Sequence, residues 1–326
     1  MTRARLRIAL PWLGEAAPAE SRLPAAEWLV AHARRGRAGE DWREWLLDEA
    51  VTDPGLLRRF PAGPCIRMAW TGARPAGTWA CAAPVHLVTA LDHLRLAAPV
   101  PLPLETHESA LLVADLNAQL AHRGFVLEDV AGRGWLCRCP DDLDCLVHEP
   151  AAAVGANLRD LQPSGRDAAR VRAWVNESQM VLHEHPVNLQ RTASGLPAVN
   201  SVWLWGFGNA ASIQRAPEGA LLTDDDWLSG LWRLHGAEPG PPDRLETALS
   251  GDAPVIRLGL AMPGRTDGSP TWSELEPRVF APARAALLRG TLDSISLLLG
   301  ATTFKVDRDA RWQFWRRSRP LAEVLR

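Results

Sequence analysis

The 326-residue sequence contains no tyrosine, only one lysine (Lys305) and no apolar run long enough to span a membrane. Positive charge is carried almost entirely by arginine, and the net charge of −2 excludes the strongly basic field typical of nucleic-acid-binding proteins. Three arginines near the N-terminus precede an apolar stretch that resembles the start of a signal peptide, but Pro11 and Glu15 interrupt it. We therefore expect a cytoplasmic protein with no nucleic-acid and no membrane partner.

Cysteine is scarce as well, with five residues in the chain. An odd number argues against the complete disulfide framework of a secreted protein. Cys137, Cys139 and Cys145 have a C-x-C-x5-C spacing, which is not a usual zinc-binding pattern. Buried thiols in a strand are favoured, and we expect neither a metal nor another cofactor.

The chain is long enough for one large or two ordinary domains. Pro99, Pro101 and Pro103 form a stiff connector, which is the best candidate for a domain boundary. We therefore predict a smaller α+β N-terminal region at residues 1–103 and an α/β domain at residues 104–326.

Apolar periodicity indicates the secondary structure. Helical spacing is found at residues 27–35, 41–49, 105–123, 167–183, 224–234 and 272–289. Strand patterns are found at residues 125–127, 135–139, 199–205, 255–261, 295–299 and 303–306. Alternating strands and helices from residue 199 onward predict an α/β fold, a layered sheet with helices. Residues 199–205 are apolar on both faces, which is typical of a central strand.

Residues 174–208, WVNESQMVLHEHPVNLQRTASGLPAVNSVWLWGFG, are richer in amides and imidazoles than burial and capping require. We expect a helix that Pro186 stops, followed by a return into the strand, so that a stripe of amides meets the carboxyl end of the strand. The amides can bind a polar ligand, or they can satisfy buried backbone groups around an irregular turn. The predicted ligand-binding residues are Asn176, Gln179, His183, His185, Asn188, Asn200 and Trp205.

Three more specific chemical interpretations, of this region and of the C-terminal segment, have less support from the sequence. His183 and His185 could bind a metal, but their spacing is not the H-E-x-x-H arrangement, and His183 also suits a helix C-terminus. Residues 206–208 resemble a phosphate-binding loop, but the third glycine and a following lysine are missing. The basic residues of the C-terminal WQFWRRSR segment are explained by cation–π packing or by a solvated chain end.

Three segments together carry a family resemblance: residues 176–188, residues 197–208 and residues 312–317. They resemble the bacterial RpfE-like regulatory proteins and relatives of cofactor-independent phosphoglycerate mutase. The resemblance to the mutase is concentrated in residues 200–206, NSVWLWG. It implies a fold related to that of alkaline phosphatase, with two metal ions and a serine or threonine nucleophile.

Two-metal catalysis needs several aspartate and histidine ligands along the chain. The sequence lacks an early Asp-Gly-x-x-Asp strand end and a later Asp…His…His set; only Asp92-His93 imitates one element. We therefore expect a non-catalytic or regulatory relative of the mutase, which binds a small polar or phosphorylated ligand or a protein partner. The alternative is an active phosphoglycerate mutase or phosphoester-processing enzyme with a reduced metal site.

Overall fold

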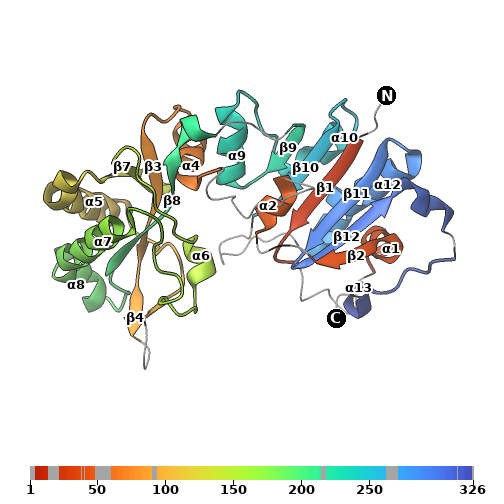
Figure 1. The fold of residues 1–326 in the computed structure, drawn as a ribbon. Coiled ribbons are helices and arrows are strands. Elements are labelled where there is room, and N and C mark those ends of the chain that lie inside the picture. The colour runs from red at the N-terminus through yellow and green to blue at the C-terminus, as the bar shows by residue number, and fades with distance from the viewer. Residues whose placement is uncertain are drawn as a thin grey trace. The chain divides into compact units, whose positions relative to one another are not determined.

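The computed structural model describes residues 4–13, 22–37, 39, 41–47, 60–89, 94–213, 218–261, 271–313 and 315–324. The chain forms two compact units, each with its own sheet (Figure 1). The parallel-sheet unit comprises Met1–Pro54, Ala216–Trp232 and Gly236–Arg326, and the antiparallel-sheet unit comprises Gly55–Arg215 and Arg233–His235.

The parallel-sheet unit has a six-stranded sheet with the order β2-β12-β11-β1-β10-β9. Its strands are β1 (Ala4–Leu10), β2 (Arg34–Arg37), β9 (Ala220–Thr223), β10 (Val255–Gly259), β11 (Leu292–Leu299) and β12 (Thr302–Asp307). β1 pairs in parallel with β10 and β11, β10 pairs in parallel with β9, and β12 and β2 add an antiparallel edge. The predicted α/β layer is therefore present, but its central strand comes from the N-terminus of the chain.

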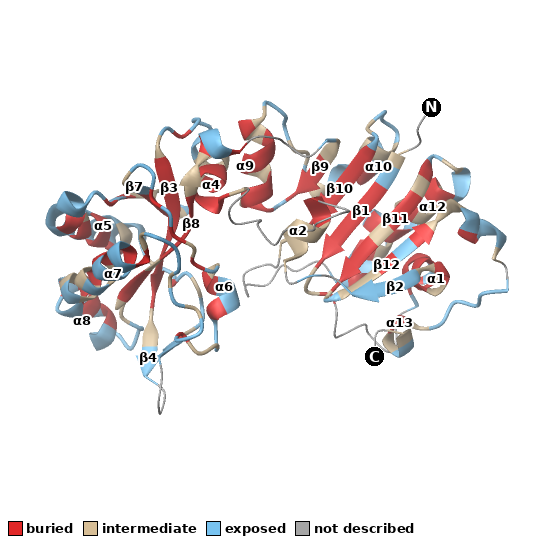
Figure 2. Cartoon of the chain, viewed as in Figure 1, coloured by how far each residue is buried: buried red, intermediate tan, exposed pale blue. Residues whose placement is uncertain are grey.

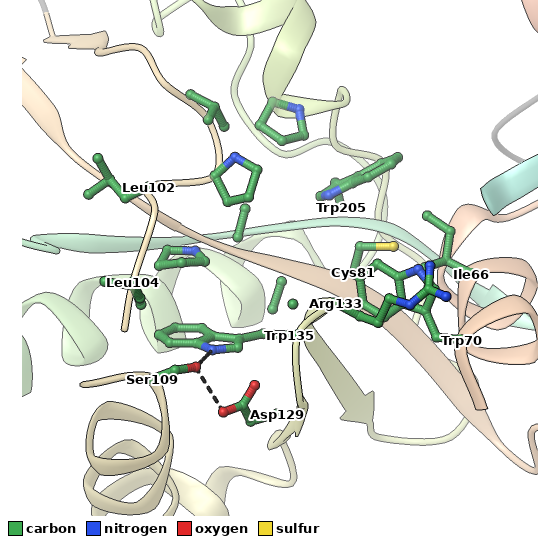
Figure 3. A pocket seen from close by; sticks show the side chains of 18 of the residues that line it. Ile66, Trp70, Cys81, Leu102, Leu104, Ser109, Asp129, Arg133, Trp135 and Trp205 are labelled. Atoms are coloured by element: carbon green, nitrogen blue, oxygen red, sulfur yellow. Dashed lines mark hydrogen bonds between the residues drawn. The ribbon is translucent and has the colours of Figure 1, made fainter. Parts of the chain in front are cut away.

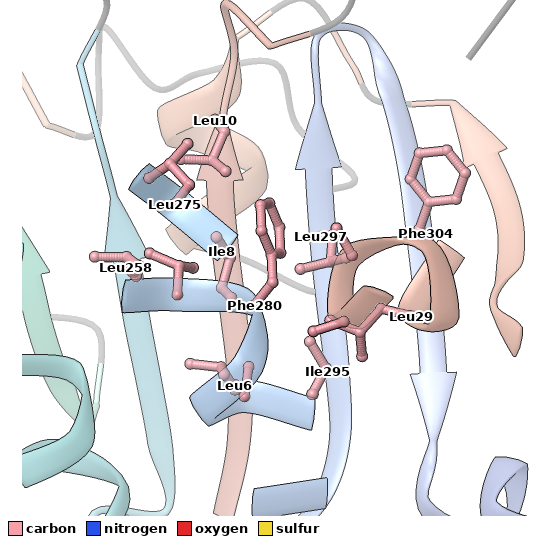
Figure 4. Close-up of a cluster of buried hydrophobic side chains, with 14 of the residues drawn as sticks. Leu6, Ile8, Leu10, Leu29, Leu258, Leu275, Phe280, Ile295, Leu297 and Phe304 are labelled. Carbon is pink, nitrogen blue, oxygen red and sulfur yellow. The ribbon is translucent and has the colours of Figure 1, made fainter. Parts of the chain in front are cut away.

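Helices accompany both faces of this sheet. They are α1 (Pro24–His32), α2 (Trp42–Leu47), α9 (Asp226–Leu234), α10 (Leu245–Leu249), α11 (Trp272–Leu275), a π-helical turn (Glu276–Phe280), α12 (Ala281–Arg289) and α13 (Leu321–Val324). Successive side chains of a strand point to opposite faces. On one face of β1, Leu6, Ile8 and Leu10 join the apolar cluster around Phe280 (Figure 4). On the other face, Arg7 donates to a backbone carbonyl of α2.

The antiparallel-sheet unit has the strand order β6-β7-β3-β8. Its strands are β3 (Thr78–Val85), β6 (Val126–Val130), β7 (Gly134–Cys139) and β8 (Ser201–Asn209), with a separate small hairpin of β4 (Leu87–Thr89) and β5 (Leu94–Leu96). Its helices are α4 (Ala62–Thr71), α5 (Thr106–Leu120), α6 (Pro150–Ala153), α7 (Ala168–His183) and α8 (Pro186–Ala193). Short 3₁₀ turns lie at Ala121–Arg123 and Ala210–Ser212 in this unit, and at Pro242–Arg244 and Arg308–Trp312 in the other.

Strand β8 lies at the edge of its sheet, so the prediction of a central strand was wrong. Its residues are nevertheless largely buried, because α4 and α7 both pack against it (Figure 2). Arg67 of α4 stacks on Trp79, whereas Ser109 of α5 bonds to Trp135, and the strand register places these two tryptophans on opposite faces. The apolar pattern on both faces of β8 therefore reflects the helices that pack against it, and not a central position in the sheet.

The observed division does not follow the predicted boundary at Pro103. The proline connector lies inside the antiparallel-sheet unit, because β3 precedes it, β7 follows it, and these strands pair with each other. The α+β part is thus the middle of the chain rather than residues 1–103. Within the described ranges, every helix is too short or too polar to cross a membrane.

Candidate functional site

Helices α7 and α8 and the start of β8 are joined by the side chain of Asn188. Its Nδ2 donates to the carbonyls of Leu182 and Val199, both at 2.7 Å, and its Oδ1 accepts from the Val199 amide at 2.8 Å. The residue is only 3% exposed. The sequence left two roles open for Asn188, ligand binding or satisfaction of buried backbone groups, and in the structure its amide bonds to backbone groups.

Asn200 serves the backbone in the same way. Its Oδ1 accepts from the Leu87 amide at 2.7 Å and its Nδ2 donates to the Leu87 carbonyl at 2.8 Å, so one side chain replaces a strand residue for the start of β4. Gln179 of α7 donates to Ser201 Oγ at 3.1 Å. Because Ser201 begins β8, the amide stripe of α7 meets the amino end of this strand and not the predicted carboxyl end. The chain returns through the short helix α8 and enters β8 beside α7. The amide stripe of α7 therefore faces the first residues of β8.

The two histidines of the motif have different surroundings. His185 is 6% exposed; its Nδ1 accepts from the Val187 amide at 3.2 Å, and its Nε2 lies 2.9 Å from Asp115 Oδ2. Both ring nitrogens are therefore engaged in capping α8 and bonding to α5. Pro186 begins α8 directly after this cap instead of ending helical structure. His183 ends α7, as its position in the sequence predicted, and it is exposed.

Four of the predicted site residues surround one open hollow of about 480 Å³. Its walls come from α7, from Asn200 and from the small hairpin; its lining residues are Leu87, Leu94, Asn176, Gln179, Met180, His183 and Asn200. Asn176 and His183 are both exposed, and they lie seven residues apart on the same face of α7. This amide hollow offers amide and imidazole groups to a polar ligand.

Trp205 lies away from the amide hollow, in a separate cavity of about 410 Å³ (Figure 3). Its walls include Trp70 and Trp135, and a short polar chain reaches it from α5: the Trp135 Nε1–H donates to Ser109 Oγ at 2.7 Å, which donates to Asp129 Oδ2 at 2.8 Å. No sequence motif indicated these partners, because Trp70, Ser109, Asp129 and Trp135 lie on four elements with no recognisable spacing.

Buried charges near the motif were also missed by sequence reasoning. Arg191 of α8 donates to Glu108 Oε2 at 2.7 Å and to the Pro197 carbonyl at 2.9 Å, and both charged side chains are buried. Glu108 also accepts from the Glu105 amide at 2.9 Å at the start of α5. The pair ties α5 to the turn before β8, so it positions the motif instead of facing a ligand.

All five cysteines are buried, and each is a free thiol. Cys137 and Cys139 lie in strand β7 as predicted, whereas Cys145 lies in the loop after it. Burial raises the pKa of Cys139 well above its ordinary value, and burial together with Asp144 raises that of Cys145 to about 11. Both therefore stay protonated at neutral pH and are poor nucleophiles. Within the described part of the chain, no three His, Cys, Asp or Glu side chains are arranged to hold a metal ion.

In the parallel-sheet unit, acidic residues follow the carboxyl end of β9. Asp225 accepts from Arg43 Nη2 at 2.8 Å and Nε at 3.0 Å, and its other oxygen accepts from the Leu228 amide at 2.8 Å, which caps α9. The Arg43 guanidinium carbon lies 4.9 Å from the ring centroid of Trp42 and 5.0 Å from that of Trp227. Asp225 is thus held in a buried ion pair at an edge where open α/β sheets place ligands.

Asp224 accepts from the Ala261 amide at 2.7 Å, which links the ends of β9 and β10. Burial raises the pKa of Asp224, and the neighbouring Asp225 and Asp226 add to the increase. Because Asp224 is exposed overall, this partial desolvation disfavours its ionised form only modestly.

Comparison with models of known protein families finds no match. A 134-residue stretch is 32% identical to the 2,3-bisphosphoglycerate-independent phosphoglycerate mutase of Methanothrix thermoacetophila, covering 38% of this chain and 33% of that protein. A 165-residue stretch is 32% identical to 2,3-bisphosphoglycerate-independent phosphoglycerate mutase 2 of Methanothermobacter thermautotrophicus, covering 44% of this chain and 39% of that protein. The matches therefore span about a third to two-fifths of the length of these curated relatives.

Two solved structures align over most of the chain. The cofactor-independent phosphoglycerate mutase of Thermoplasma acidophilum aligns with 93% of this chain and 89% of its own, at 16% identity and a TM-score of 0.45. A Pyrococcus horikoshii protein aligns with 94% and 88%, at 16% identity and a TM-score of 0.46. The sequence matches carry the relationship: this chain is similar to cofactor-independent phosphoglycerate mutases.

Proposed function

We propose that this chain is a regulatory, non-catalytic relative of the cofactor-independent phosphoglycerate mutases that binds a small polar or phosphorylated ligand or a protein partner. The sequence matches support the relationship to the mutases. The proposal departs from them in chemistry, because Asp224 and Asp225 at the carboxyl edge of the parallel sheet bond to backbone amides and to Arg43.

The ion pair between Arg43 and Asp225 carries this proposal. A divalent ion at Asp225 would have to displace a guanidinium that is bonded twice to the carboxylate and packed near two tryptophans. The side chains are 11% and 5% exposed, so separating them would leave a buried charge without its partner. A carboxylate held in this way is a poor metal ligand, and two-metal phosphoryl transfer needs several good ones.

The carboxyl end of strand β1 also supports a loss of metal chemistry. Leu10, at the end of the central strand, is fully buried in the apolar cluster, and Leu13 just beyond it is buried as well. Apolar side chains at this position provide no oxygen or nitrogen for a metal ion or a phosphate.

Elemental analysis of the purified protein tests the loss of metal chemistry. We expect far less than one manganese or zinc per chain after equilibration with either ion and removal of the excess. About two bound metals per chain would contradict the proposal and favour the alternative of an active mutase or phosphoester-processing enzyme with a reduced metal site.

The amide hollow is the proposed ligand site, with Asn176, Gln179 and His183 as its donors. The test uses 3-phosphoglycerate as the probe in calorimetric titrations of the wild-type chain and of the variants Asn176→Ala and His183→Ala. Both variants should weaken binding by about tenfold, since each removes a polar contact to a charged ligand. Gln190→Ala, an exposed amide on α8 outside the hollow, is the matched control. Equal affinities in all four proteins, or no binding to the wild type, would contradict this placement.

A further inference from the structure

A pocket lined by arginine lies at the C-terminal end of the parallel-sheet unit. Its volume is about 460 Å³. The lining residues are Arg35, Arg316, Arg317, Arg319 and Glu323, over Val30, Ala31 and Val324. The sequence singled out this basic segment, and the function proposed above makes no use of it.

The pocket is assembled from parts of the chain far apart in sequence. α1, β2 and α13 lie side by side (Figure 1), and α1 and α13 are in contact. Arg35 of β2 donates from Nη1 to the Val324 carbonyl of α13 at 3.4 Å. Arg316 donates from Nη1 to the carbonyls of Ala31 and Ala33, at 3.3 Å and 3.4 Å, at the end of α1. Carbonyl groups at a helix C-terminus favour cations, so these contacts hold two guanidinium groups at the pocket.

The charge of the pocket is opposite to that of the whole chain. Four guanidinium groups face one carboxylate, which leaves an excess of three positive charges in a chain of net charge −2. Arg34 on the same strand is paired with Asp307, so it adds little to this excess. Concentrating positive charge around a hollow raises the local concentration of anions.

Guanidinium groups match the geometry of phosphate, to which they donate two parallel hydrogen bonds. An excess of three positive charges exceeds what one phosphate group neutralises at neutral pH. The volume lies in the range of small-molecule sites, which are roughly 300–1,000 Å³. We propose that this pocket binds a small soluble ligand that carries two or more phosphate groups.

The proposal concerns the parallel-sheet unit alone and does not depend on the function proposed above. Inorganic tripolyphosphate is the probe, titrated calorimetrically into the full chain at low ionic strength. The variant Arg317→Gln/Arg319→Gln should weaken binding by about tenfold or more, because two charge-assisted contacts are lost. The matched control Arg278→Gln/Arg289→Gln removes two exposed arginines of the same unit outside the pocket and should bind within about twofold of the wild type.

Thermal melts of each variant show that it is folded; if the double variant is not, Arg35→Gln replaces it with the same expectation. Equal weakening in the pocket and control variants, or no binding of tripolyphosphate to the wild type, would overturn the proposal. Single-stranded oligonucleotide and phosphoinositide-containing vesicles are titrated alongside. Tighter binding of either one than of tripolyphosphate, lost in the pocket variant, would overturn the assignment to a small soluble ligand.

Discussion

The amide of Asn188 bonds to the backbone with both of its ends, and this decides between the two roles open to it from the sequence. Asn188→Ala leaves the Val199 amide and the Val199 carbonyl without their partner in a buried place. It also removes one bond to the Leu182 carbonyl, which keeps its bond from the His185 amide. We expect a loss of roughly 2–4 kcal/mol in the free energy of unfolding, measured by urea denaturation.

Asn176→Ala is the control for this prediction, because Asn176 is an exposed asparagine of the same motif. It should change the free energy of unfolding by less than about 0.5 kcal/mol. Similar losses in the two variants would contradict a structural role specific to Asn188.

The sequence pointed to the polar residues of this motif but could not assign a role to each of them. An asparagine that binds a ligand and one that bonds to a backbone turn are the same letter at the same spacing. His185 shows the reason: its partner Asp115 lies 70 residues earlier, and only the packing of α5 against α8 brings the two together. His183 is different, because exposure at the end of a helix follows from local periodicity alone.

At the scale of elements, α4 approaches β8 closely at Gly206. This glycine has a φ of 65°, and a Cβ built on it would lie 2.5 Å from the Cβ of Ala62. Gly206→Ala should therefore cost roughly 2–4 kcal/mol, through the strained backbone and the displaced helix together. Thermal and urea unfolding of the purified variant measure the cost.

Gly195→Ala separates the two causes. Gly195 has a φ of 74°, but a Cβ there would meet nothing within 4 Å, so only backbone strain applies. Its cost should stay near 1 kcal/mol. If both variants lose the same stability, the close packing of α4 on β8 contributes nothing measurable.

The link between β9 and β10 predicts a pH dependence. Burial raises the pKa of Asp224 above its usual value, so the ionised carboxylate lowers stability at neutral pH. Asp224→Asn removes this cost and keeps an oxygen for the Ala261 amide. The variant should melt at a higher temperature than the wild type at pH 7.

The sign of this effect fixes its pH range. Below the unfolded pKa of about 4 the wild-type side chain is protonated in both states, so the cost is absent; it appears as pH rises through the folded pKa. The two melting temperatures should therefore converge toward pH 3. A variant that melts below the wild type at pH 7 would contradict the assigned cause.

At the scale of the whole molecule, local patterns predicted the elements well and their grouping poorly. Helices over residues 167–183 and 272–289 and the strand from residue 255 are present, because periodicity and capping are properties of neighbouring residues. The two predicted domains are not present as units, because β1 pairs with β10 and β11 across more than 200 residues. Such pairings leave no local pattern in the sequence.

Insertion of the antiparallel-sheet unit into the parallel-sheet unit explains the misplaced boundary. A chain that leaves one unit at Pro54, after two strands of its sheet, and returns to it at Ala216 has no single boundary for a composition shift to mark. The proline connector was a real local feature, but it lies within one unit. Likewise, the arginines of the C-terminal pocket become a cluster only when α1, β2 and α13 meet.

The most direct test of the proposed function is an assay of phosphoglycerate interconversion. The purified full chain, supplied with manganese, is incubated with 3-phosphoglycerate, and the formation of 2-phosphoglycerate is followed by phosphorus NMR. Because Asp225 is held by Arg43 and the end of β1 is apolar, we predict no interconversion above the rate without protein. Manganese-dependent formation of 2-phosphoglycerate, abolished by Asp225→Asn, would contradict the account and show an active mutase.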